Sequence, residues 1–548
     1  MKMYSENERF STSRVFLAQK IIIFIAGIQS LMEKLLRSWN YSFMTIIFDR
    51  RDSIMQYGFD NEKYTAMQSA HIAERINHFG GKLYLELGGK LFDDFHASRV
   101  LPGFHPDSKV QMFLKLSDQS EIVIVVNADD IEKSKVRGDL GITYDADALR
   151  LIDAFRNIGL YVGSVVLTRF AHQRNACVFE NRLKQLGVDV YRHYTIAGYP
   201  LDVEHIVSEE GFGRNDYIKT TRPLVLVTAP GPGSGKMATC LSQLYQENAR
   251  GIKAGYAKFE TFPIWNLPLK HPVNVAYEAA TVDLNDINMI DPFHLEAYDV
   301  KTVNYNRDIE IFPVLNALFE EVWGRSPYKS PTDMGVNMVG HCIINDDVCR
   351  KAASQEIIRR FFSTKCAAMQ GDATQEEVAK IKLLMQQLNL SEDDRPVIAA
   401  ARKRSEETET PALAIQLHDG RIITSKTTAL LGPSAALILN ALKALGDIAK
   451  DQHLISPPVL KPIQQLKCLY LGNNNPRLHS DETLLALSIS AADNEVSALA
   501  MSQIPNLKGC EVHSTVILPS VDANIFRRLG LNVTCDPKYQ TRKLYHKK

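Results

Sequence analysis

Short apolar runs rich in β-branched residues alternate with amphipathic stretches from Met44 onward. Two such runs are "KLYLEL" at 82–87 and "EIVIVVNA" at 121–128, whereas "YDADALRLIDAFRNIG" at 144–159 has its apolar residues at helical spacing. Strands separated by helices of this length are joined by right-handed crossovers and build a parallel sheet. The sequence therefore predicts an α/β fold in which helices cover both faces of a mostly parallel sheet, in three layers.

The chain has 548 residues, which is too long for one ordinary core. An apolar run at 21–28 is too short to span a bilayer, so we expect the N-terminal segment to be an extension, with a signal or anchor and an ordinary helix as alternatives. The predicted divisions are an extension outside the fold at 1–43, an α/β domain at 44–342, a helical subdomain at 343–405 and a C-terminal α/β subdomain at 406–548.

Charge and cysteine content narrow the class of partner. Lys plus Arg and Asp plus Glu both number 63, so no net field attracts nucleic acid or an acidic membrane. The eight cysteines are scattered without a C-x-x-C pair, which indicates free thiols in a reducing compartment. We therefore expect a cytoplasmic protein with a small-molecule ligand, without nucleic-acid or membrane partners. The charged helices at 343–405 allow a homo-oligomer, although such faces also occur in plain contact with solvent.

A Gly-rich loop with the sequence "APGPGSGKM" at 229–237 lies between an apolar run and a helical pattern. It resembles the phosphate-binding pattern G-x-x-x-x-G-K-[ST], but Pro230 stands at the first Gly and Met237 at the hydroxyl position. Free N–H groups and the dipole at the start of a helix attract anions. The predicted phosphate-binding residues are Gly231, Gly233, Ser234, Gly235, Lys236 and Thr239.

Three interpretations of this loop stay open: a nucleotide or other phosphate site, a site for another anion such as a carboxylate, and a turn without ligand. Thr239 lies two residues after Met237, and on a helix its hydroxyl is rotated by about 200° from that position. It would therefore be a poor substitute as a ligand of magnesium.

The order of strand, Gly-rich loop with Lys, helix and "RGIKAGYAKF" at 250–259 resembles the P-loop synthetases of the dethiobiotin-synthetase kind. In those enzymes a second Lys at the end of the next strand also faces the nucleotide phosphates and the substrate. The resemblance implies that Lys258 has this catalytic position, with ATP and Mg as cofactors.

Three further polar segments could complete a site. "LELGGKLFDDFHASR" offers Lys90 and Arg99 for a phosphate or carboxylate, unless it is a turn with ion-paired side chains. Asp283 and Asp286 in "EAATVDLNDINMIDPFHLE" could hold the magnesium ion that Met237 cannot, unless these charges are solvated. The loop "SPYKSPTDMGVN" adds Lys329 as a substrate-binding candidate. Its carboxylate Asp333 is the last candidate of this kind.

Several long stretches resemble one bacterial family, known as domain of unknown function 1846. They include "GFDNEKY", "GGKLYLELGGKLFDDFHASRVLPGF" and "KFETFPIWNLPLKHPVNVAYEAATVDLNDINMIDPFHLEAY", and the resemblance extends from Met44 to near the C-terminus. It implies an uncharacterised cytosolic protein with an α/β core, a helical subdomain and a further α/β subdomain. Some members have carried the label ATP-dependent peptidase, but H-E-x-x-H and G-x-S-x-G are both missing from this sequence.

The expected function is the binding of ATP or another phosphorylated small molecule at the loop 230–236. Ligation or phosphoryl transfer to a small carboxylate is the reaction that we expect, because such chemistry depends mainly on positioning and charge stabilisation. The alternative is a protein that binds a phosphorylated metabolite without turnover, or that serves only for interaction.

Overall fold

The computed structural model describes residues 57–89, 91–92, 94–137 and 141–540. The predicted extension at 1–43 and the candidate Lys90 lie outside the described residues. All the elements below belong to one compact unit that begins at Tyr57. No helix among the described residues is both long and apolar enough to cross a membrane.

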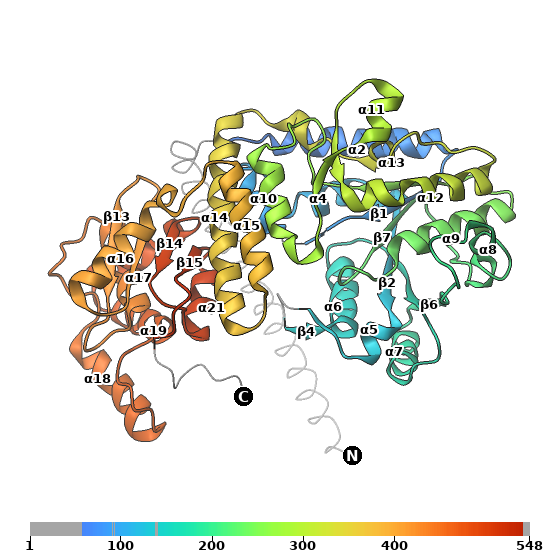
Figure 1. Cartoon of the computed structure of the whole chain (residues 1–548). Coiled ribbons are helices and arrows are strands. Elements are labelled where there is room, and N and C mark those ends of the chain that lie inside the picture. The colour runs from blue at the N-terminus through green and yellow to red at the C-terminus, as the bar shows by residue number, and fades with distance from the viewer. Residues whose placement is uncertain (1–56, 90, 93, 138–140, 541–548) are drawn as a thin grey trace, which may run out of the picture. The chain divides into compact units, whose positions relative to one another are not determined.

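Seven parallel strands form the main sheet and confirm the predicted α/β class (Figure 1). Their order is β11-β8-β1-β7-β2-β5-β6, and every neighbouring pair runs parallel. The strands are β1 (Leu83–Leu87), β2 (Ser120–Asn127), β5 (Val162–Thr168), β6 (Asp189–Arg192), β7 (Leu224–Thr228), β8 (Gly255–Phe259) and β11 (Gly335–Val336).

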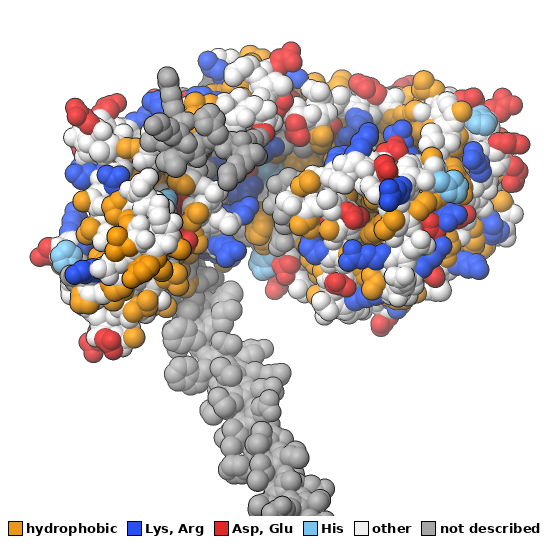
Figure 2. Space-filling view, turned by 90° about the horizontal axis from the view of Figure 1, so that it is seen from below, with side chains coloured by type: hydrophobic (Ala, Val, Ile, Leu, Met, Phe, Trp, Pro, Cys, Tyr) orange, Lys and Arg blue, Asp and Glu red, His pale blue; other side chains and the backbone are white. Residues whose placement is uncertain are grey.

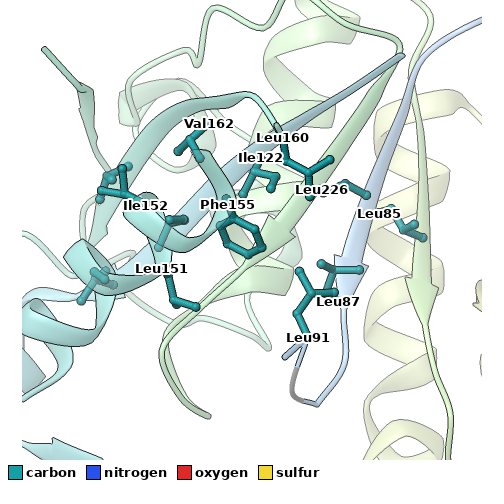
Figure 3. Packing of buried hydrophobic residues seen from close by; sticks show 14 of the residues in the cluster. Leu85, Leu87, Leu91, Ile122, Leu151, Ile152, Phe155, Leu160, Val162 and Leu226 are labelled. Carbon is teal, nitrogen blue, oxygen red and sulfur yellow. The ribbon is translucent and has the colours of Figure 1, made fainter. Parts of the chain in front are cut away.

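One face of this sheet is covered by helices that precede β7 in the chain. Leu151, Ile152 and Phe155 of one helix belong to the same core as Leu85 of β1 and Leu226 of β7 (Figure 3). Side chains alternate along a strand, so Leu85 and its second neighbours face this core. The covering helices are α2 (Asn61–His78), α4 (Ser108–Lys115), α6 (Tyr144–Asn157) and α7 (Arg174–Gln185).

The opposite face is covered mainly by later helices, which completes three layers. Tyr84 of β1 and Tyr256 of β8 pack there against Leu241 and Phe319. The covering helices are α8 (Val203–Ile206), α9 (Lys236–Ala249) and α12 (Asn306–Trp323). Gly324 ends α12 in the left-handed conformation, as a helix C-terminus favours.

The crossovers leave β1 and β7 toward opposite faces. β1 continues to β2 through α4 on the first face, whereas β7 continues to β8 through α9 on the second. The two strands are hydrogen-bonded neighbours, so their following loops diverge at one point of the carboxyl edge of the sheet. In open α/β sheets such a point is where ligands bind. The loops concerned begin at Gly88 and at Ala229.

Shorter elements lie between the strands of the main sheet. Near the carboxyl edge, β9 and β10 form a small antiparallel pair. These elements are α3 (Phe95–Val100), α5 (Ala128–Glu132), β3 (Val136–Arg137), β4 (Ile142–Thr143), α10 (Pro272–Ala280), β9 (Asn288–Ile290), α11 (Pro292–Tyr298), β10 (Val303–Tyr305) and α13 (Pro331–Met334).

Three helices follow the main sheet: α14 (Asp346–Gln370), α15 (Gln375–Gln387) and α16 (Pro396–Thr408). The first two confirm the helices predicted from their charged, Gly-poor sequences. Thr374 and Glu377 form a capping box at the start of α15. The polar sequence "SEETETPA" at 405–412 predicts a linker, but this is wrong for its first half, because α16 continues through it to Thr408. The domain boundaries themselves stay predictions.

The C-terminal region has a second sheet of four strands in the order β13-β12-β14-β15. Its first two strands form the antiparallel hairpin that Asp419-Gly420 predicts, with Gly420 at a φ of 87°. The apolar run "STVILP" at 514–519 predicts a strand, but this prediction is wrong, because β14 ends at Ser514, the first residue of that run. The elements are β12 (Ala412–Gln416), β13 (Ile422–Lys426), α17 (Pro433–Leu445), α18 (Pro457–Gln465), α19 (Ser480–Ser490), α20 (Glu495–Ser502), β14 (Glu511–Ser514), α21 (Ser520–Arg528) and β15 (Asn532–Cys535).

Several large apolar side chains of the C-terminal region are exposed. Leu469, Tyr470 and Leu471, which follow α18, are each more than 70% exposed. Figure 2 shows hydrophobic side chains gathered at the lower left of the view. The C-terminal region therefore leaves apolar surface in contact with solvent, unlike the doubly covered main sheet.

Candidate functional site

The loop between β7 and α9 is held by its own hydrogen bonds. The Ser234 hydroxyl donates to the Gly231 carbonyl (2.7 Å), and the Thr168 hydroxyl of β5 donates to the Ser234 carbonyl (2.6 Å). A Cβ on Gly231 would lie 2.3 Å from the Tyr144 hydroxyl, so only glycine fits there. Gly235 precedes α9 with a φ of 90° and gives the helix no side-chain cap. The first N–H groups of α9 are thus available to an anion.

Lys236 is the first residue of α9 and is half-buried. It forms no hydrogen bond or ion pair with any residue that the structure describes, so its charge is available to a ligand. Met237 packs against the apolar core of the second face. Thr239 is 1% exposed, and its hydroxyl has no hydrogen-bond partner among the described residues. The loop therefore offers N–H groups and one ammonium group, with an apolar side chain at the position of the magnesium-binding hydroxyl.

A second group of charges lies at the ends of β1 and β8. Glu86 of β1 stands opposite Lys258 of β8 in the sheet register, and both are buried or nearly so. The Lys258 ammonium pairs with the Glu260 carboxylate (3.0 Å) and with that of Asp308, in the first turn of α12. We call Glu86, Glu260 and Asp308 the carboxylate cluster. This buried group therefore contains three carboxylic acids and only one ammonium group, that of Lys258.

The pKa values of both Lys258 and Glu260 lie above their ordinary values in the folded protein. Burial alone would lower the pKa of Lys258, but Asp308, Glu260 and Glu86 outweigh burial and hold it above its ordinary value. Burial raises the pKa of Glu260 to about 7, and Asp308 adds to this while Lys258 opposes it. At neutral pH Lys258 is therefore a fixed cation, and Glu260 is the group that can exchange a proton.

The loop and the carboxylate cluster are neighbours across β1. Burial raises the pKa of the Cys240 thiol, Glu86 raises it further and Lys236 lowers it, so both charges act on this one position of α9. Because adjacent strands are about 4.8 Å apart, the strand of Lys258 lies roughly 10 Å from the strand that leads into the loop. A small molecule could contact both.

Comparison with known proteins decides the family. The profile described as "Domain of unknown function DUF1846, N-terminal" matches residues 57–389, and that described as "Domain of unknown function DUF1846, C-terminal" matches 393–545. The chain belongs to the DUF1846 family. This confirms the resemblance found in the sequence, whereas the resemblance to P-loop synthetases finds no support in these comparisons.

Members of the family with similar sequences come from streptococci and are named UPF0371 proteins. One from Streptococcus equi subsp. equi (strain 4047) is 57% identical over 487 residues, which cover 89% of this chain and 99% of the relative. One from Streptococcus pneumoniae (strain Hungary19A-6) is 57% identical over 489 residues, with the same coverage. These names state no activity.

Three of the other candidates in this DUF1846 protein have partners of their own. Arg99 donates twice to Glu356 of α14, with both distances at 3.0 Å. The Lys329 ammonium lies over the ring of Tyr298, 5.3 Å from its centre. Asp333 accepts hydrogen bonds from the Tyr298 hydroxyl and the Lys329 N–H, both at 2.9 Å. These contacts join elements of the fold, and the use of these residues for a substrate stays a prediction.

The two aspartates predicted to hold metal differ in their surroundings. Asp283 is exposed, whereas Asp286 is buried and lies 3.4 Å from the Arg307 guanidinium. Burial raises the pKa of Asp286, and the nearby Asp308 charge raises it further, so this loop does approach the carboxylate cluster. No group of three or more His, Cys, Asp or Glu side chains is placed to hold a metal ion in the part of the chain that the structure describes.

The sequence interpretation missed Glu260, Asp308 and Glu86 as site residues. Glu260 directly follows β8, which carries Lys258, and its place at a strand end could have indicated a role. Asp308 lies 50 residues after Lys258, and only the packing of α12 brings the two side chains together.

Proposed function

We propose that this protein binds a small phosphorylated molecule, ATP among the candidates, with a phosphate on the first turn of α9. The observation that carries the proposal is the uncapped start of α9, with an unpaired Lys236 among the described residues, where the crossovers of β1 and β7 diverge. Free N–H groups, the helix dipole and a lysine together favour a phosphate. Gly231, Gly233, Ser234 and Gly235 would supply the backbone around it.

For catalysis we propose proton transfer beside the bound phosphate. Glu260 would act as general acid or base, and Lys258 would stabilise negative charge that develops in the reaction. A carboxylate acceptor, as in the ligase reaction, is disfavoured because the carboxylate cluster would repel it. Phosphoryl transfer to a neutral group is compatible with these charges. Of the two predicted magnesium ligands, Asp286 is the one whose charge interacts with Asp308 and Lys258.

A binding protein without turnover is the second candidate. It is favoured by Met237, which packs into the apolar core at the position where a hydroxyl would hold magnesium. Assay of ADP formation from ATP by the full chain, with hydroxyl compounds added as acceptors, separates the two candidates, because only the enzyme converts ATP to ADP when it transfers the phosphoryl group.

Lys236→Ala is expected to weaken the binding of ATP and of inorganic phosphate at least about tenfold, because a charge-assisted hydrogen bond to phosphate is lost. Calorimetric titration of the full chain, with and without magnesium, measures this loss.

Lys253→Ala is the matched control, since Lys253 is exposed and precedes β8 at the opposite edge of the sheet. If folded Lys236→Ala bound phosphate as tightly as Lys253→Ala, or if the unaltered protein bound neither compound, the proposal would be wrong.

A further inference from the structure

Buried polar atoms without partners gather beyond the carboxyl ends of β1 and β8. Most buried polar groups in native proteins are hydrogen-bonded, so a local group of exceptions calls for a reason. The atoms come from α2, α3, the loop after β8 and β10, and each lacks a hydrogen-bond partner among the described residues. They are Tyr64 Oη, His96 Nε2, Thr261 Oγ1, Trp265 Nε1 and Tyr305 Oη.

Ring contacts and close approaches place several of these residues beside the carboxylate cluster. The ring centre of Tyr277 lies 5.4 Å from that of His96 and 5.8 Å from that of Tyr305. A Cβ on Gly335 would lie 2.3 Å from the Trp265 ring and 3.1 Å from the Glu260 carboxylate. The aromatic side chains and the Glu260 carboxylate therefore lie close together beyond the end of β8.

Tyr305 is the residue that belongs to the unpartnered polar atoms and also interacts electrostatically with the carboxylate cluster. Tyr305 is 5% exposed, its ring packs against that of Tyr277, and its hydroxyl has no hydrogen-bond partner among the described residues. Burial raises the pKa of Tyr305 well above its ordinary value, and the charges of Glu260 and Asp286 add to the rise. The charges of these acids thus reach this hydroxyl, which has a hydrogen bond left to make.

The charges of the whole edge restrict what could lie there. The start of α9 with Lys236 is positive, whereas the carboxylate cluster exceeds Lys258 in charge by two when all three acids are ionised. A ligand that contacts both the start of α9 and the carboxylate cluster would have its negatively charged group only at the α9 end. At its other end hydroxyl groups would donate to Glu260 and accept from Lys258 or Tyr305, whereas a second phosphate would be repelled.

From this we infer that the organic part of the ligand is polyhydroxylated, as in a sugar phosphate, and is bound by Tyr305, Glu260 and Lys258. The inference rests on the proposed phosphate site and adds the class of compound. It explains why a polar, hydroxyl-bearing side chain lies buried and unpaired beside an acidic cluster.

Tyr305→Phe tests the inference, because it removes one hydroxyl and little volume. The titrants are glucose 6-phosphate, ribose 5-phosphate, inorganic phosphate and n-hexyl phosphate, which has no hydroxyl groups on its chain. We expect at least one sugar phosphate to bind the full chain at least tenfold more tightly than hexyl phosphate. The variant should weaken that binding about fivefold or more and leave inorganic phosphate unchanged. Tyr245→Phe on α9, whose hydroxyl donates to Glu209 (3.3 Å), is the control.

Thermal unfolding without ligand gives a second reading. The Tm of Tyr305→Phe should equal or exceed that of the unaltered protein, since the lost hydroxyl has no partner. A lower Tm with unchanged affinities would mean that buried water alone serves this hydroxyl, and would overturn the inference. Binding of inorganic phosphate without preference for sugar phosphates would overturn it too, but leave the phosphate site standing. If no phosphate compound binds, the proposed function fails, and this inference with it.

Discussion

Replacing Arg395 by Met is expected to destabilise the fold by about 3–5 kcal/mol, because two carbonyls lose this buried donor and the Glu511 carboxylate keeps only Arg359 and Asn532. Arg395 directly precedes α16 and is 1% exposed. Its guanidinium pairs with Glu511 of β14 and donates to the carbonyls of Val512 (3.1 Å) and Asn532 (2.8 Å). It thus ties the helices after the main sheet to two strands of the C-terminal sheet.

Guanidinium unfolding followed by far-UV circular dichroism measures this loss. Arg421→Met is the matched control, because Arg421 pairs with Asp419 at the exposed turn of the hairpin between β12 and β13, where about half of each side chain is exposed. An exposed pair of this kind contributes at most about 1 kcal/mol. Equal effects of the two substitutions would show that the buried arginine has no special structural role.

Glu260→Gln is expected to make the protein more stable than its parent at pH 8, by up to about 3 kcal/mol, with no gain at pH 4.5. The folded state raises the pKa of Glu260 to about 7, compared with 4.5 ordinarily, so it holds this proton more tightly than the unfolded chain. The parent therefore loses unfolding free energy as the pH rises from 4.5 to 7. Above pH 7 it carries the whole cost of a buried charge, which Gln avoids.

Unfolding of both proteins at pH 4.5, 5.5, 6.5 and 8 gives the difference directly. Glu320→Gln on the exposed side of α12 should show a difference that does not change with pH. A difference for Glu260→Gln that stayed constant across this range would contradict the raised pKa, and with it the role of Glu260 as acid or base.

The sheet strands could be predicted because their information is local. "EIVIVVNA" has the uninterrupted apolar, β-branched character of a strand covered on both faces, and β2 at Ser120–Asn127 agrees with it within one residue. The strand predicted at "STVILP" has the same character but lies mainly beyond the ladder, since Ser514 is the last residue that pairs with β12. Where β14 ends depends on which residues find a pairing partner in β12, and the local sequence does not show this.

The candidate site was predictable only where its residues are consecutive. Loop 229–235 and Lys236 form a contiguous pattern, and the structure places them between a strand and a helix as expected. The carboxylate cluster joins positions 86, 260 and 308, which approach only through strand order and the docking of α12. For the same reason the ion pairs of Lys258 could not be foreseen, although its place at the end of β8 could.

The position of β1 inside the sheet also sets the sequence of events in folding. Both of its neighbours, β7 and β8, are made about 140 or more residues after it, whereas β2 follows it closely but never touches it. A nascent chain that ends before Leu224 therefore has a central strand with both edges unpaired, the condition that favours association with other chains. Folding of the main sheet must await these late strands, so chaperone dependence should be greatest before they leave the ribosome.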